Sequence, residues 1–175
     1  MAGGLEDLIK QVVASLSGSG TGGGSSNSKQ QVIDYLKDKG YSNEAIAGIT
    51  ANIDIETGGT FNYKEKEDLK VTGDELGEGY GLFQFSGSMK KNYEKYKKNN
   101  KKKDSIETQI DFMDEIVKGT SDHSLGNIPG QILKGELFSG KFGPDRIAES
   151  FNSIFEGGKF DDRRKASAID IFKSL

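Results

Sequence analysis

The stretch at residues 42–59 constrains the fold more than any other part of this 175-residue chain. Ser42 is a favourable N-cap residue, and the paired Gly58 and Gly59 are typical of a helix end. Between them, isoleucines recur at helical spacing, at Ile46, Ile49 and Ile53. At about 100° per residue, Glu56 falls on the same side of this predicted helix. A carboxylate at the end of an apolar stripe is costly to ionise, so Glu56 is the first candidate for a functional residue.

The composition narrows the chemistry that such a residue would serve. Cysteine is absent and His123 is the only histidine. Disulfides, thiolate nucleophiles and zinc sites built from thiolates or paired imidazoles are therefore excluded. The chain also lacks the Gly-x-Ser-x-Gly turn of a serine hydrolase. We expect no metal and no cofactor, and we expect any acid–base catalysis to fall to carboxylates.

The first 28 residues differ in character from the rest of the chain. Residues 1–16 carry a short amphipathic pattern with apolar side chains on one face. Residues 17–28 are a linker rich in glycine and serine. This arrangement predicts a docking helix on a flexible tether, with a disordered or engineered leader as the alternative. We place the folded domain at residues 29–175.

Helical patterns dominate the folded domain. Besides residues 42–59, we predict helices around Val32 and Ile132 and after the cap residues Ser88, Ser105, Asp145 and Asp161. Residues 60–79 lack helical periodicity and are rich in turn residues, which indicates an irregular region with a small hairpin near residues 70–72. The predicted fold class is mostly α, a helical bundle with a small β-hairpin or irregular lobe.

Charged residues are segregated along the chain, although the net charge is only −3. Residues 65–78 carry six acidic residues, and residues 90–103 carry eight lysines. We interpret the lysine run as a solvated helix end and loop, with a polyanion site as the alternative. No recognition motif or stacking platform accompanies it, so we expect no nucleic-acid partner. No apolar run approaches the length of a membrane span.

Four blocks, in the same order, resemble the phage tail lysozyme domain of the lysozyme and lytic transglycosylase superfamily. Residues 47–58 resemble its Ala-Gly-Ile…Asn…Glu-Ser-Gly block, and residues 79–87 resemble its Gly-x-Gly-Leu-x-Gln-Trp-x-Gly block. Residues 109–116 resemble its Gln-x-x-Phe-x-x-x-Glu-Leu helix. Residues 147–165 resemble its C-terminal block of a Phe, a Phe-Glu pair and two adjacent arginines. Together the blocks span nearly the whole folded part.

This resemblance implies a lysozyme-like fold with a lobe beside a catalytic cleft. It also implies cleavage of the β-1,4 bond between N-acetylmuramic acid and N-acetylglucosamine in peptidoglycan, with Glu56 as the general acid. An acid that protonates a glycosidic oxygen near neutral pH needs a raised pKa, which an apolar setting provides. Glycosidases usually use a second carboxylate, for which the acidic loop offers Asp74 and Glu78. Lytic transglycosylases resemble the same pattern and work with one glutamate, so both reactions stay open.

The resemblance also suggests how the substrate is held. Gln84 matches a family position close to the cleft, where its amide would bind the substrate or orient Glu56. We predict that Tyr80 and Tyr63 line the sugar groove. Phe85 stands where the family usually has Trp and still offers a ring face for stacking on a sugar.

The expected partners follow from the same resemblance. They are peptidoglycan glycan strands and, through residues 1–16, other phage tail proteins, with the protein located in the virion and acting on the cell wall. The alternative is a non-catalytic glycan-binding or tail-assembly module with the same fold.

Overall fold

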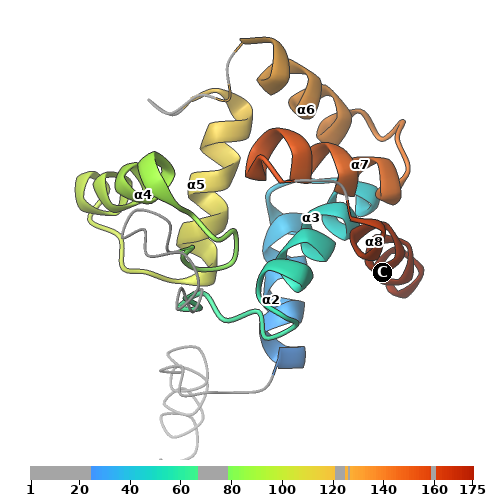
Figure 1. The fold of residues 1–175 in the computed structure, drawn as a ribbon, viewed down its shortest axis with the longest axis horizontal. Coiled ribbons are helices and arrows are strands. Elements are labelled where there is room, and N and C mark those ends of the chain that lie inside the picture. Colours follow the sequence, from blue (N-terminus) through green and yellow to red (C-terminus); the bar gives the residue numbers. More distant parts are fainter. Residues whose placement is uncertain (1–24, 67–78, 121–124, 126, 159–160) are drawn as a thin grey trace, which may run out of the picture.

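The computed structural model describes residues 25–66, 79–120, 125, 127–158 and 161–175. These residues are mostly helical, as predicted (Figure 1). The elements are α2 (Ser25–Asp38), α3 (Asn43–Glu56), α4 (Gly87–Asn99), α5 (Ile106–Lys118), α6 (Asn127–Ser139), α7 (Pro144–Ser150), the π-helical turn η1 (Phe151–Glu156) and α8 (Asp162–Ser174). The predicted hairpin near residues 70–72 lies outside the described residues. Among the residues that are described, β-pairing is limited to one isolated antiparallel bridge between Lys66 and Tyr80.

The central helix is α3, which is the helix predicted from residues 42–59. Figure 1 shows it surrounded by α2, α7 and α8. Ser42 caps it as predicted, because the serine side chain accepts a hydrogen bond from the Ala45 N–H. The predicted stripe of α3 is buried in the main core, at Ile46, Ile49 and Ile53. Ala47 and Ala51 belong to a second cluster with residues of α7 and α8. Helix α3 therefore buries more than one face.

A small residue allows α7 to approach α3 closely. A Cβ atom at Gly48 would lie 2.7 Å from Ile147 Cγ2 and 3.0 Å from the Ala148 backbone nitrogen. One turn later, the buried Asn52 side chain donates hydrogen bonds to the backbone oxygens of Gly48 (2.8 Å) and Ala148 (3.1 Å). Close packing and the hydrogen bonds of Asn52 hold α3 and α7 together. They therefore also fix the position of the C-terminal end of α3.

An aromatic cluster fills the core on the side of α4 and α5. It comprises Phe83, Phe85, Tyr93, Tyr96, Phe112, Phe151 and Phe155. Helix α5 carries the predicted apolar stripe, whose residues Ile106, Ile110 and Met113 are buried. Ser105 caps this helix as expected, since its side chain accepts from the Thr108 N–H.

Two predicted helix starts were wrong. Helix α4 has Ser86 as its N-cap, so Ser88 lies inside the first turn. Helix α7 has Gly143 as its N-cap and Pro144 at its first position, which places Asp145 within the helix. Proline is well suited to that position because its fixed φ is helical and the N–H it lacks would have no helical acceptor. Asp161 caps α8 as predicted, accepting from the Arg163 N–H.

No helix in the part of the chain that the structure describes is long and apolar enough to cross a membrane.

Candidate active site

Glu56 is the last residue of α3, and the backbone that follows it is firmly held. The Thr57 hydroxyl donates to the Ile53 carbonyl (2.7 Å) and accepts from the Phe61 N–H (3.1 Å). Gly59, with a φ of 80°, turns the chain back so that its N–H reaches the Asp54 carbonyl (2.7 Å). A positive φ is one that glycine adopts without a steric penalty. These hydrogen bonds therefore fix the backbone from which the Glu56 side chain extends.

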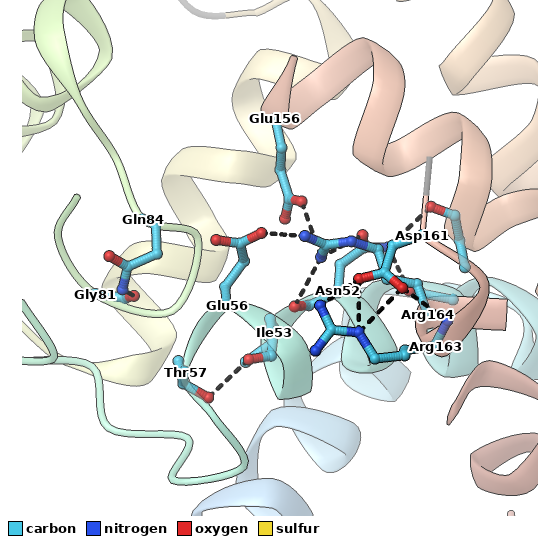
Figure 2. Close-up of polar contacts among 12 residues, drawn as sticks. Asn52, Ile53, Glu56, Thr57, Gly81, Gln84, Glu156, Asp161, Arg163 and Arg164 are labelled. Atoms are coloured by element: carbon cyan, nitrogen blue, oxygen red, sulfur yellow. Dashed lines mark hydrogen bonds and ion pairs between the residues drawn. The ribbon is translucent and has the colours of Figure 1, made fainter. Parts of the chain in front are cut away.

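The Glu56 carboxylate lies against Arg164 of α8 (Figure 2). The Glu56 side chain is 23% exposed, whereas the Arg164 side chain is only 10% exposed. The other guanidinium nitrogen of Arg164 donates to the Asn52 side-chain oxygen (3.0 Å) and the Asn52 carbonyl (3.3 Å). Asn52 is the residue that bridges α3 and α7, so the arginine is held from the same point that fixes these helices. The candidate acid Glu56 is thus partly exposed to solvent and contacts an arginine that is itself held by hydrogen bonds.

A second carboxyl group shares this arginine. Glu156 ends η1, and its Oε2 atom lies 3.4 Å from Arg164 Nη1. Its side chain is 6% exposed, and neither carboxyl oxygen has a hydrogen-bond partner among the described residues. Burial raises the pKa of Glu156 well above its usual range, the charge of Glu56 acts in the same direction, and the charge of Arg164 opposes both. Burial therefore disfavours the ionised form of this carboxyl group.

Sequence reasoning missed this arrangement. The apolar stripe led us to expect Glu56 in an apolar setting, whereas its carboxylate contacts a guanidinium. The available signal was the resemblance of residues 147–165, which contain both Glu156 and Arg164. The adjacent Arg163 is different in kind, since it is 75% exposed and pairs with Asp161 at the start of α8.

Gln84 sits in a tight turn across from Glu56 (Figure 2). Its amide nitrogen donates to the Gly81 carbonyl (2.8 Å), and its buried amide oxygen has no hydrogen-bond partner among the described residues. A Cβ atom at Gly79 would lie 2.3 Å from that oxygen and 3.0 Å from the Gln84 Cβ atom, so a larger residue there would require the Gln84 side chain to shift. Gln84 also adopts a φ of 45°, which is unusual for a residue with a side chain. The side chain folds onto Gly81, and its predicted role toward Glu56 stays a prediction.

The two predicted groove tyrosines are both half-buried. The Tyr80 hydroxyl donates to Asp104, and the ammonium groups of Lys90 and Lys97 lie 5.8 Å and 6.0 Å from its ring centre. The Tyr63 ring has the ammonium group of Lys64 at 5.3 Å. Each residue is partly exposed, and its contact with a sugar stays a prediction.

Phe85 has a different environment from the one predicted. It is 1% exposed and packs between Tyr93 and Phe112, with ring centres 5.1 Å and 5.4 Å away. A ring that is covered on both sides by the core has no face free for a sugar. Phe85 is therefore a core residue, and we leave it out of the substrate-binding set.

The predicted second carboxylates, Asp74 and Glu78, lie outside the described residues. Among the described residues, no group of three or more histidine, aspartate or glutamate side chains is arranged to hold a metal ion. The acid–base groups that the structure brings together are Glu56 and Glu156, on either side of Arg164.

The described residues form an α-helical domain in which two carboxyl groups share one buried arginine, an arrangement that acid–base catalysis can use. Residues 27–175 match the family model described as phage tail lysozyme. The chain therefore belongs to the phage tail lysozyme family. A search of curated proteins found no match. Family membership indicates a phage-associated, lysozyme-like enzyme that degrades peptidoglycan.

Proposed function

We propose that this protein is a phage tail-associated peptidoglycan hydrolase that breaches the cell wall locally. It cleaves the β-1,4 bond between N-acetylmuramic acid and N-acetylglucosamine, with Glu56 as the general acid. The observation that carries this proposal is the setting of Glu56, a partly exposed carboxyl group at the end of the central helix and in contact with the buried Arg164. A catalytic acid has to reach a bulky polymer and also hold one orientation, and this position meets both needs.

The contact with Arg164 suits the charge change that the reaction requires. Glu56 donates its proton to the glycosidic oxygen while the bond to the sugar breaks, and the sugar ring becomes positively charged in the transition state. The glutamate is then an anion, which the guanidinium stabilises by a charge-assisted hydrogen bond. The second carboxylate is either Asp74 or Glu78, or the acetamido group of the substrate takes that role.

The remaining binding groups are proposed with the same function. Gln84 supplies an amide near the reacting bond, and the exposed parts of Tyr80 and Tyr63 contact sugar rings. Residues 1–16 dock the enzyme onto other tail proteins.

Replacing Glu56 by Gln tests the proposal directly. The variant keeps the shape of the side chain but has no proton to donate, so we expect release of soluble muropeptides to fall by about 10²–10⁴-fold. Circular dichroism and urea unfolding check that the fold is retained. Asp170→Asn on α8, where the aspartate is 80% exposed and lies 3.6 Å from Lys173, makes the same charge change at the surface and is expected to retain activity. Equal activity of Glu56→Gln and the parent would overturn the assignment.

Mass spectrometry of the products separates the alternatives. A reducing muramic acid end is expected for hydrolysis, whereas a 1,6-anhydro end identifies a lytic transglycosylase. If the protein sediments with purified peptidoglycan and releases no product, it is a glycan-binding module rather than an enzyme.

A further inference from the structure

Glu56, Arg164 and Glu156 form a cluster with an unbalanced charge. Two carboxyl groups from α3 and η1 meet one guanidinium from α8. With both carboxyl groups ionised, the cluster would carry a net charge of −1 in a largely buried place. Asn52, the other partner of the arginine, is neutral and contributes only oxygen acceptors. One bound proton would remove the excess charge, and burial favours that outcome.

The neighbouring charged residues have partners of their own. Glu136 of α6 pairs with Arg146 of α7 at 3.1 Å. Glu149 of α7 lies 3.8 Å from Arg146 and 3.7 Å from Lys165 of α8. Asp161, the cap of α8, pairs with Arg163 and also feels the charge of Arg164. Among the described charged groups, those that act on Glu156 itself are Glu56 and Arg164.

We propose that the Glu56–Arg164–Glu156 cluster holds one proton in the working enzyme, and that Glu156 sets the upper pH at which Glu56 acts as an acid. This inference rests on the proposed function of Glu56. Arg164 is a positioning residue that pairs with whichever carboxyl group is ionised. In the structure it bonds Glu56 and stands 3.4 Å from Glu156, which is the arrangement expected when Glu156 carries the proton.

The reactive arrangement has the proton on Glu56 and the arginine closer to Glu156. Glu56 then gives this proton to the glycosidic oxygen, which takes the electron pair of the breaking bond, and Arg164 returns to the new carboxylate. The proton is replaced from the attacking water in hydrolysis, or from the sugar hydroxyl that closes the ring in transglycosylation. A carboxyl group facing a guanidinium alone would favour its charged form, whereas two carboxyl groups that share one guanidinium leave one negative charge that a bound proton can neutralise.

Glu156→Gln tests this reasoning because glutamine has the same shape but cannot ionise. We expect the high-pH limb of the kcat/KM pH profile to move to lower pH by at least one unit. At pH values above this limb, the variant should then be at least tenfold less active than the parent. Glu149→Gln is the matched control, with the same charge change on a more exposed residue of α7, and its limb should coincide with that of the parent. If Glu56→Gln is inactive while Glu156→Gln keeps the parental pH profile, the proposed function stands and the one-proton cluster is wrong.

A second measurement does not depend on activity or on the folding of a Glu156 variant. In the unsubstituted protein labelled with ¹³C at glutamate carboxyl groups, one buried resonance should titrate well above the ordinary glutamate value of 4.5. In Glu56→Gln the same resonance should titrate at lower pH, because the neighbouring negative charge is gone. If every glutamate resonance titrates near the ordinary value, or if Glu56→Gln leaves the high resonance in place, the proposal is overturned.

Discussion

The close contact between α3 and α7 makes Gly48→Ala the most informative test of how the site is built. The new methyl group would lie 2.7 Å from Ile147 Cγ2 and 3.0 Å from the Ala148 nitrogen, whereas carbon atoms in good contact are about 3.5–4.0 Å apart. Neither neighbour can easily give way. Ile147 is β-branched and has essentially one side-chain rotamer in a helix, and the other atom is backbone. The two helices must therefore separate by up to about 1 Å.

The expected cost follows from two opposing effects. Overpacking of a well-packed core destabilises by about 1–3 kcal/mol. Alanine favours the helix over glycine by about 1 kcal/mol, which offsets part of this. We expect Gly48→Ala to lower the free energy of unfolding by up to about 2 kcal/mol. The separation also stretches the hydrogen bond from Asn52 to the Ala148 carbonyl, so activity should fall under conditions in which the variant is still folded.

Urea unfolding measures the first effect, with Gly135→Ala as the matched control. Gly135 lies inside α6, and no atom lies within 4 Å of the position that an alanine methyl group would take there, so the same substitution meets open space. This control should be unchanged or up to about 1 kcal/mol more stable. If Gly48→Ala is as stable as Gly135→Ala, close packing at Gly48 does not constrain the helices and the reasoning fails.

Two further substitutions test other parts of the fold. Gln109 is fully buried; its side chain accepts a hydrogen bond from the Leu82 N–H (2.8 Å) and donates one to the Tyr63 carbonyl (2.7 Å). Gln109→Ala should therefore lower the free energy of unfolding, measured in urea, by about 2–4 kcal/mol. A loss below about 1 kcal/mol would contradict this role. Burial raises the pKa of Asp111, but hydrogen bonds from lysine and tyrosine side chains outweigh burial and leave the pKa below its ordinary value of 3.8. Its contribution to stability is therefore present above the unfolded-state pKa and is lost as the pH falls through the lower folded-state value. Asp111→Asn should lower the free energy of unfolding by about 1 kcal/mol at pH 7 and by progressively less below about pH 4. A difference in stability that does not change with pH would argue against a stabilising charge on Asp111.

Local features of this fold were predictable from the sequence, whereas the surroundings of the site were not. The caps at Ser42, Ser105 and Asp161 and the buried stripe of α5 depend on residues within a few positions of one another. The contact between Glu56 and Arg164 joins residues 108 positions apart. Helical periodicity shows which side of α3 Glu56 occupies, but it cannot show that α8 places a guanidinium there.

The environment of Phe85 was also not predictable from the sequence. The family pattern places an aromatic residue at this position, and an aromatic ring suits both a sugar platform and a core. The choice is made by the way residues 79–85 fold against α4 and α5, where Tyr93 and Phe112 enclose the ring. Sequence type alone does not distinguish the two outcomes.

The cluster at the end of α3 is costly for the stability of the fold, and this cost indicates that the cluster serves a purpose. Both oxygens of Glu156 and the Nε of Arg164 are buried and have no hydrogen-bond partner among the described residues. Apolar side chains of similar size at such sites are often neutral or stabilising by a few kcal/mol. The Asn52 side chain links this cluster by hydrogen bonds to the backbone of both α3 and α7. Gly48 allows the two helices to approach closely enough for both hydrogen bonds to form. Gly48 and Asn52 thus help to fix the position of Glu56, and a site that gives up stability in this way is what the proposed function would require.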